Sequence, residues 1–248
     1  MSEGKGTEPG RGRLFCTTHW TVVLEAGQER SEEAQDALAT LCETYWYPLY
    51  AFARGLGRGP EEAEDLVQGF FAHLIERNTL RVANRERGRF RTFLLTAFKR
   101  FTTNDWQRER AQKRGGGERT LSLDCRVGER RLEDEISGQS GPDQEYERRW
   151  ALTLIGNART RLRQEFIDGG KAERFDALEP HLVGDSDSRT YAELAQRFGI
   201  SEAGVKTEAF RLRQRYRHHL RAEVAKTVAS TQEIDDEIAH LMTALGCG

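Results

Sequence analysis

The residues best suited to chemistry lie in one stretch, GISEAGVKTEAFRLRQRYR, which covers residues 199–217. It offers cations and one aromatic ring rather than a nucleophile or paired carboxylates. Lysine and arginine bind phosphates, arginine also hydrogen-bonds to guanine, and a phenylalanine ring can contact a thymine methyl group. The candidate positions are Ser201, Lys206, Thr207, Phe210, Arg211, Arg213 and Gln214. The chemistry that they suit is contact with DNA.

The sequence around these residues predicts a helix-turn-helix. Thr190 and Glu193 form a capping box that begins a first helix, and Gly199 can end it in a left-handed conformation. Ser201 is a good N-cap for a second helix. The apolar stripes are Tyr191, Leu194, Ala195 and Phe198, followed by Val205, Ala209, Leu212 and Tyr216. A helical hairpin with a solvated basic face is the alternative, and an outward phenylalanine counts against it.

Charge is segregated along the 248 residues, although the net charge is only −2. Residues 85–119 hold eleven basic and four acidic side chains (+7), and residues 189–221 hold eight and three (+5). Residues 118–147 lie between them with four basic and nine acidic side chains (−5). Two basic blocks favour two contacts with one polyanion. We expect the acidic linker and the tail to cover these blocks in the free protein.

The sequence predicts an all-α fold, because prolines are few and apolar residues recur at helical spacing. We expect two helical domains joined by a flexible acidic linker. The predicted segments are a disordered N-terminus (1–17), a helical bundle (18–114), a linker (115–146), a helix-turn-helix domain (147–228) and an amphipathic tail (229–248). The tail carries Ile234, Ile238, Leu241 and Leu245 on one stripe, which suits a short helix docked on the body.

Two helices of the predicted bundle have a clear outer face. In GPEEAEDLVQGFFAHLIE the core face is Ala63, Leu66, Val67, Phe70 and Leu74, and the outer face is Asp65, Gln68, Ala72 and Glu76. In the next helix the inward residues are Phe90, Phe93, Leu94, Ala97 and Phe101, and the outward ones are Thr92, Lys99, Thr103, Trp106 and Arg110. Trp106 suits stacking on an unpaired base and equally suits packing against another helix.

Other site classes lack support in the sequence. The cysteines Cys16, Cys42, Cys125 and Cys247 form no Cys-x-x-Cys pair, so we expect reduced thiols in a cytoplasmic protein. His218 and His219 form a surface pair without ligand spacing, and Asp134 and Glu135 suit a solvated linker. No apolar run could span a bilayer, and the N-terminus lacks a secretory pattern. We expect no cofactor, no metal, no membrane insertion and no enzymatic activity.

Three motifs together resemble one family. EEAEDLVQGFFAHL is similar to region 2.2 of the extracytoplasmic-function (ECF) sigma factors, within the sigma-70 family of bacterial RNA polymerase. GRFRTFLLTAFKRFTTNDWQRER resembles regions 2.3–2.4, and TYAELAQRFGISEAGVKTEAFRLRQRYR resembles region 4.2. The matches cover most of residues 20–220, and further segments resemble the long ECF factors common in planctomycetes. The resemblance implies a region 2-like bundle, a region 4-like helix-turn-helix and no enzymatic role.

The resemblance also implies partners and roles for the two faces. Core RNA polymerase, through the clamp helices of its largest subunit, would contact Asp65, Gln68, Ala72 and Glu76. The melted strand of the −10 element would contact Asn84, Arg85, Arg87, Arg89, Arg91, Lys99, Thr103, Trp106 and Arg110. The −35 element of the promoter DNA would contact the positions named above in residues 201–214. An anti-sigma protein is a further partner that the sequence leaves open, together with the promoter and the inducing signal.

Two other function classes compete with this interpretation. A helix-turn-helix transcription regulator that is not a sigma subunit would need an effector or phosphoacceptor domain, and the basic all-helical N-terminal block argues against one. A nuclease-like enzyme would need carboxylates or metal ligands that face one cleft, and no such spacing is present. We therefore expect a sigma factor rather than either alternative.

Overall fold

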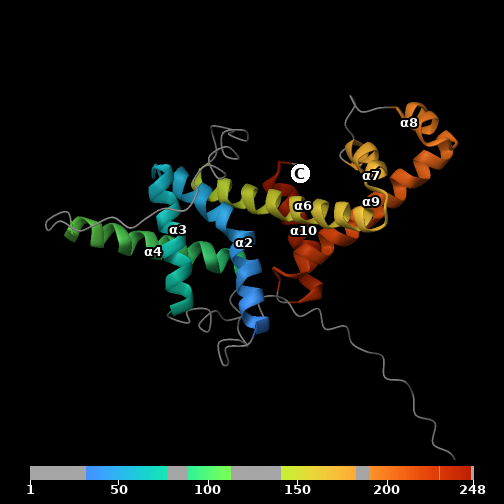
Figure 1. The fold of residues 1–248 in the computed structure, drawn as a ribbon. Coiled ribbons are helices and arrows are strands. Elements are labelled where there is room, and N and C mark those ends of the chain that lie inside the picture. Colours follow the sequence, from blue (N-terminus) through green and yellow to red (C-terminus); the bar gives the residue numbers. More distant parts are fainter. Residues whose placement is uncertain (1–31, 77–88, 113–140, 183–189, 229, 247–248) are drawn as a thin grey trace, which may run out of the picture.

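The fold is all-α in the part of the chain that the computed structural model describes, residues 32–76, 89–112, 141–182, 190–228 and 230–246 (Figure 1). The first helices are α2 (Glu32–Gly55), α3 (Pro60–Glu76) and α4 (Phe90–Gln112). They are followed by α6 (Pro142–Asp168), α7 (Ala172–Leu178), the 3-10 turn η3 (Glu179–Leu182), α8 (Tyr191–Phe198) and α9 (Glu202–Ala225). A second 3-10 turn, η4 (Thr231–Glu233), leads into α10 (Ile234–Ala244). Within these ranges no helix is both long and apolar enough to cross a membrane.

A large hydrophobic core joins α2, α3 and α4 to the first half of α6, the end of α9 and α10. Its centre is aromatic, because Phe98 of α4 meets Phe52 of α2 and Phe70 of α3 edge to face, with ring centroids 5.9 and 5.0 Å apart. The core face predicted for α3 is confirmed, since Ala63, Leu66, Val67, Phe70 and Leu74 are all buried. The core therefore fixes which face of α3 meets solvent.

The buried side of α4 is wider than the sequence pattern predicts. Phe90 and Leu94 are buried, whereas Phe93, Ala97 and Phe101 are only partly covered. Leu95 and Phe98, which the pattern left out of the core, are buried as well. The large core contacts α4 from α2, α3 and α6, so a single stripe of apolar residues underestimates the covered surface.

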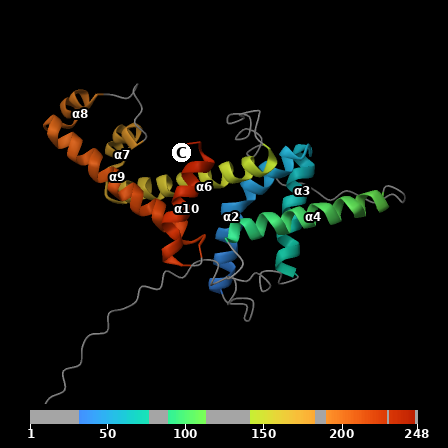
Figure 2. The ribbon, with the colours of Figure 1, turned by 180° about the vertical axis from the view of Figure 1, so that it is seen from behind.

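A small hydrophobic core holds the end of α6 against α7, α8 and α9. Its buried members are Leu162, Phe175, Leu178, Leu194, Val205, Ala209 and Leu212. Both α6 and α9 extend from this small core to the large one and pack against each other along the way (Figures 1 and 2). At 24 residues, α9 alone spans about 36 Å.

The boundary predicted from sequence differs from the structure at the start of the second block. The predicted linker ends at residue 146, whereas α6 begins at Pro142, which suits a first helical position. Tyr146 is fully buried in the large core rather than exposed in a linker. The rest of the predicted linker is mostly outside the described residues, as is the predicted disordered N-terminus. The second block thus supplies part of the core of the first.

The amphipathic stripe of the tail corresponds to α10, which packs on α6 and α9. Ile234 and Leu241 are buried in the large core, and Ile238 and Leu245 are partly covered by it. An 11-residue helix is too short to be stable alone in water, so α10 depends on this packing. The tail is therefore an element of the N-terminal core rather than of the helix-turn-helix.

Candidate nucleic-acid interface

The turn between α8 and α9 has the local structure that the sequence predicts. Thr190 and Glu193 form a reciprocal capping box, in which the Glu193 amide donates to Thr190 Oγ1 at 3.3 Å and the Thr190 amide donates to Glu193 Oε2 at 2.7 Å. Gly199 ends α8 with a φ of +65°, which a residue with a Cβ adopts at a cost. Ser201 Oγ then accepts from the Gly204 amide at 3.1 Å and caps α9.

The small core fixes the rotation of α9 about its axis. Val205, Ala209 and Leu212 are buried against Leu194 and its neighbours, and Tyr216 is half-buried. The opposite side of the helix therefore faces solvent, and its exposed side chains include Lys206, Thr207, Phe210, Arg211 and Gln214. The outward face of α9 predicted from helical spacing is present in the structure.

Phe210 and Arg211 are the most informative residues of this face. Phe210 is 55% exposed, although the adjacent Ala209 is buried in the small core. Arg211 is exposed and has no ion-pair partner among the described residues. Lys206, in contrast, makes an ion pair of 2.7 Å with Glu202, which raises the pKa of its ammonium group. The outer face of α9 thus carries the exposed Phe210 ring beside the Arg211 guanidinium, which has no ion-pair partner among the described residues.

Arg213 does not lie free at the flank of α9, where helical spacing placed it. Its side chain is half-buried, and Nη2 donates to the Tyr191 hydroxyl at 3.0 Å. Nε donates to the carbonyl oxygen of His181 at 3.2 Å. The guanidinium therefore joins α9 to α8 and η3, where both of its partners are uncharged oxygens.

The one acidic residue at the centre of the basic helix is neutralised from inside the protein. Glu208 is half-buried and forms an ion pair with Arg174 of α7 rather than with Arg211. The Arg174 guanidinium also lies over the Phe198 ring, 5.1 Å from its centroid. Because Glu208 is paired behind the face, its carboxylate opposes a DNA phosphate less than a free one would.

The outer face of α3 forms a second exposed surface. Asp65, Ala72 and Glu76 are exposed, as the helical spacing predicts, and Gln68 is half-buried and donates to Glu64 at 3.2 Å. Ile75 is 54% exposed on the same side, although it is not among the outer-face residues predicted from the sequence. Its position three residues after Ala72 and seven after Gln68 is the signal that could have identified it. Acidic groups and an apolar side chain thus share this surface.

The residues assigned to a melted strand are only partly described. Asn84, Arg85 and Arg87 lie outside the described residues, and so do the side chains of Trp106 and Arg110 on α4. Lys99 and Thr103 are exposed on α4, but Lys99 forms an ion pair with Asp143 of α6. Arg89 is 30% exposed at the start of α4. The structure therefore brings Lys99 and Thr103 to the surface of α4, with Arg89 partly exposed just before the helix begins.

Arg91 is buried, and this corrects its assignment to the exposed DNA-binding set. It is 4% exposed, and its Nε donates to Glu237 Oε1 of α10 at 2.7 Å. Its Nη1 donates to both carboxylate oxygens of Glu147 at 2.8 Å. The Trp150 ring lies 5.0 Å below the guanidinium. Desolvation lowers the pKa of Arg91, but the hydrogen bond that Arg91 donates to Glu237 and the charges of the two carboxylates raise it overall.

Arg91 lies in a set of charged and titratable side chains that contact one another. We call this set the buried ion cluster: Arg89, Arg91, Glu147, Glu237 and His240. Arg89 Nη1 lies 2.7 Å from Glu237 Oε2, in an ion pair whose angle is outside hydrogen-bonding geometry. His240 Nε2 lies 2.9 Å from Glu147 Oε2. The cluster unites the start of α4, the start of α6 and α10, which are far apart in sequence.

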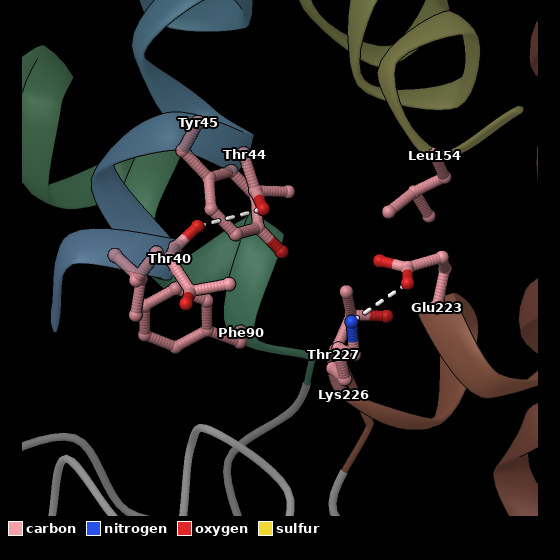
Figure 3. Close-up of a pocket in the computed structure, with 9 residues that line it drawn as sticks. Thr40, Thr44, Tyr45, Phe90, Leu154, Glu223, Lys226 and Thr227 are labelled. Carbon is pink, nitrogen blue, oxygen red and sulfur yellow. Dashed lines mark hydrogen bonds and ion pairs between the residues drawn. The ribbon is translucent and has the colours of Figure 1, made fainter. Parts of the chain in front are cut away.

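The described residues offer no other site of comparable definition. A cavity between α2, α6 and α9 is lined by Tyr45, Phe90, Glu223 and Lys226 among others, and it has room for about one water molecule (Figure 3). No group of histidine, cysteine or acidic side chains within the described ranges could hold a metal ion. Burial first, and the charge of Glu43 second, raise the pKa of the Cys42 thiol to about 11.

Comparisons of the chain with models of known protein families, with curated proteins and with solved structures found no match. The chain's own residues, and the motifs that they form, are therefore the basis for proposing a function. Two surfaces carry it: the outer face of α9 with Phe210 and Arg211, and the outer face of α3 with Asp65 and Ile75.

Proposed function

We propose that this chain is an ECF-type sigma factor that binds core RNA polymerase and directs promoter recognition, DNA melting and transcription initiation. The observation that most supports the proposal is the exposed Phe210 beside Arg211 on the outer face of a capped helix-turn-helix. The ring can contact a thymine methyl group, and the guanidinium beside it can hydrogen-bond to a guanine edge.

In this proposal α9 enters the major groove of the −35 element. Arg211 hydrogen-bonds to a guanine edge, and Phe210 contacts a neighbouring base. Lys206 and the exposed Arg217 bind flanking phosphates, in place of the Arg213 that the sequence alone suggested. Arg213 acts indirectly, because it holds α9 against α8 and η3. Specificity and affinity then come from different residues of one helix.

In this proposal the N-terminal bundle binds core polymerase and contacts the melted −10 strand. The outer face of α3 binds the polymerase clamp through Asp65, Gln68 and the exposed apolar Ile75. The melted −10 strand lies along α4, from its start to the exposed Lys99 and Thr103. An acidic face with one apolar contact suits a protein partner rather than DNA, because DNA phosphates would repel it. The two surfaces therefore take different partners.

The proposal is tested by co-purification with core RNA polymerase. The double variant Asp65→Ala, Gln68→Ala should lose most of the bound polymerase, because it removes polar groups from the proposed contact face. The matched control is Asp236→Ala, Gln232→Ala, which removes the same residue types from exposed positions at α10 and η4. Unchanged polymerase binding by the α3 variant, with native helicity, would remove the α3 assignment.

A transcription regulator that is not a sigma subunit is the second candidate. The helix-turn-helix has its own small core, so it has the packing that a DNA-binding unit needs without polymerase. Tight, sequence-specific binding to duplex DNA by the protein alone, without any binding to core polymerase, would favour this candidate.

A further inference from the structure

The C-terminal helix brings a carboxylate to the cationic start of α4. Glu237 is fully buried, and its two oxygens lie 2.7 Å from Arg91 Nε and 2.7 Å from Arg89 Nη1. Arg91 and Glu237 are 146 residues apart in sequence, so this contact depends entirely on the docking of α10. One carboxylate therefore bridges two guanidinium groups.

The charges of the buried ion cluster balance only while α10 is docked. Two guanidinium groups, from Arg89 and Arg91, face two carboxylates, from Glu147 and Glu237. Glu147 belongs to α6 and would stay with Arg91 if α10 moved away. Arg89 would then lose the only ion-pair partner that it has among the described residues, and the remaining cluster would carry one net positive charge. An undocked α10 thus leaves an anion site at the start of α4.

Outside the buried ion cluster, the attachment of α10 is limited in extent. Ile234 and Leu241 are its buried apolar anchors, and the Arg221–Asp235 ion pair at its first turn is exposed to solvent. Short elements with few buried contacts open at a lower free-energy cost than the whole domain does. The helix is therefore suited to leave its site without unfolding the bundle.

We propose that α10 competes with single-stranded DNA for the start of α4, with the Glu237 carboxylate in the position that a backbone phosphate takes when the strand binds. Carboxylate and phosphate oxygens accept the same charge-assisted hydrogen bonds from guanidinium groups. Free protein then binds a strand weakly, and strand binding displaces α10. This inference rests on the proposed function, in which the start of α4 meets the melted strand.

The first test measures binding of a fluorescent oligothymidine to the full chain by anisotropy over a range of salt concentrations. Glu237→Gln keeps the side-chain shape and removes the competing charge. It should tighten binding on the order of tenfold and steepen the salt dependence by about 0.7 in log–log slope, the value of one more phosphate contact. Asp236→Asn is the matched control, since it removes one exposed negative charge from the neighbouring position and should change binding little.

A double variant tests whether the gain in affinity for the oligothymidine comes from Arg89. When Arg89→Ala is added to Glu237→Gln, the gained affinity should disappear. Three outcomes would overturn the proposal: Glu237→Gln binds no tighter than Asp236→Asn, the gain survives the loss of Arg89, or duplex DNA gains as much as the single strand. The last outcome would mean that the exposed charge attracts any polyanion.

The wild-type protein provides a test that does not depend on the folding of a variant. Hydrogen exchange of the α10 amides should become faster when the oligothymidine saturates the protein at low salt, while the α3 amides keep their protection. Unchanged protection of α10 in the saturated complex would contradict displacement. None of these assays contains polymerase. If these assays fail while sigma activity is intact, only the competition between α10 and the strand is rejected. If they succeed although the protein does not bind polymerase, only the sigma-factor proposal is rejected.

Discussion

Arg213 of α9 donates a hydrogen bond to the Tyr191 hydroxyl of α8 at 3.0 Å, across the turn of the helix-turn-helix. A second bond, to the His181 carbonyl oxygen, attaches the same guanidinium to η3. This arginine therefore holds the two helices of the motif together, and its charge is directed inward.

We predict that Arg213→Ala destabilises the protein, because it removes two partly buried hydrogen bonds. The expected loss is about 1–2 kcal/mol in the free energy of unfolding. Arg217→Ala is the matched control, since Arg217 is exposed one turn further along α9 and should cost less than about 0.5 kcal/mol. Urea denaturation followed by circular dichroism measures both values. Equal stability of the two variants would show that Arg213 makes no bracing contribution in solution.

Arg211 and Lys206 should differ in what their loss does to DNA binding. Arg211→Ala should cost on the order of 1–3 kcal/mol at the preferred −35 sequence and relax specificity at one or two base pairs. Lys206→Ala should weaken all sequences alike and reduce the salt dependence. Transcription from a set of −35 variants separates the two effects. If both variants lose activity equally on every sequence, α9 binds only phosphates and specificity resides elsewhere.

The buried ion cluster should make Arg91 far more important for stability than Arg89. Arg91→Ala leaves the buried carboxylate of Glu237 without its hydrogen-bond donor, which costs about 3–5 kcal/mol for a buried pair. Arg89→Ala removes a partly exposed partner and should cost about 1 kcal/mol or less. Thermal and urea unfolding of the two variants give the comparison. Similar losses would mean that Arg91 is not buried in solution as it is in the structure.

The Cys42 thiol should react slowly. Its pKa of about 11, raised from 9.0, means that about a hundredfold less thiolate is present near pH 8 than in an unperturbed thiol. The other three cysteines are replaced by serine, and the reaction of Cys42 with a disulfide reagent is followed against pH. The rate should rise steadily up to about pH 11 in the native protein and level off near pH 9 in urea. The same profile in both conditions would exclude a buried thiol.

The helix-turn-helix could be predicted in detail because its signals are local. The capping box of Thr190 and Glu193, the left-handed Gly199 and the Ser201 cap each depend on residues at most three positions away. The apolar stripe of α9 then determines which side chains face outward. The exposure of Phe210 was predicted correctly for this reason. The outer face of α3 follows from the same helical spacing.

The partners of Arg91 and Arg213 could not be predicted from local patterns, because they come from other elements. Arg91 precedes the buried Leu95 and Phe98 by four and seven residues, so helical spacing alone places it inside. Its charge suggested the surface instead, and the compensating Glu237 lies at the other end of the chain. Long-range ion pairs of this kind leave no pattern in the neighbouring sequence. The apolar stripe of the tail predicted a docked helix, but it did not indicate that α10 joins the N-terminal core.

The central claim is sigma activity, and run-off transcription tests it most directly. Core RNA polymerase is incubated with a library of genomic promoter fragments, with and without the protein, and the transcripts are sequenced. We predict transcripts that require the protein, that start at a limited set of sites, and that are lost with Arg211→Ala. Transcripts that are the same with and without the protein, although it is folded and the polymerase is active, would contradict the account.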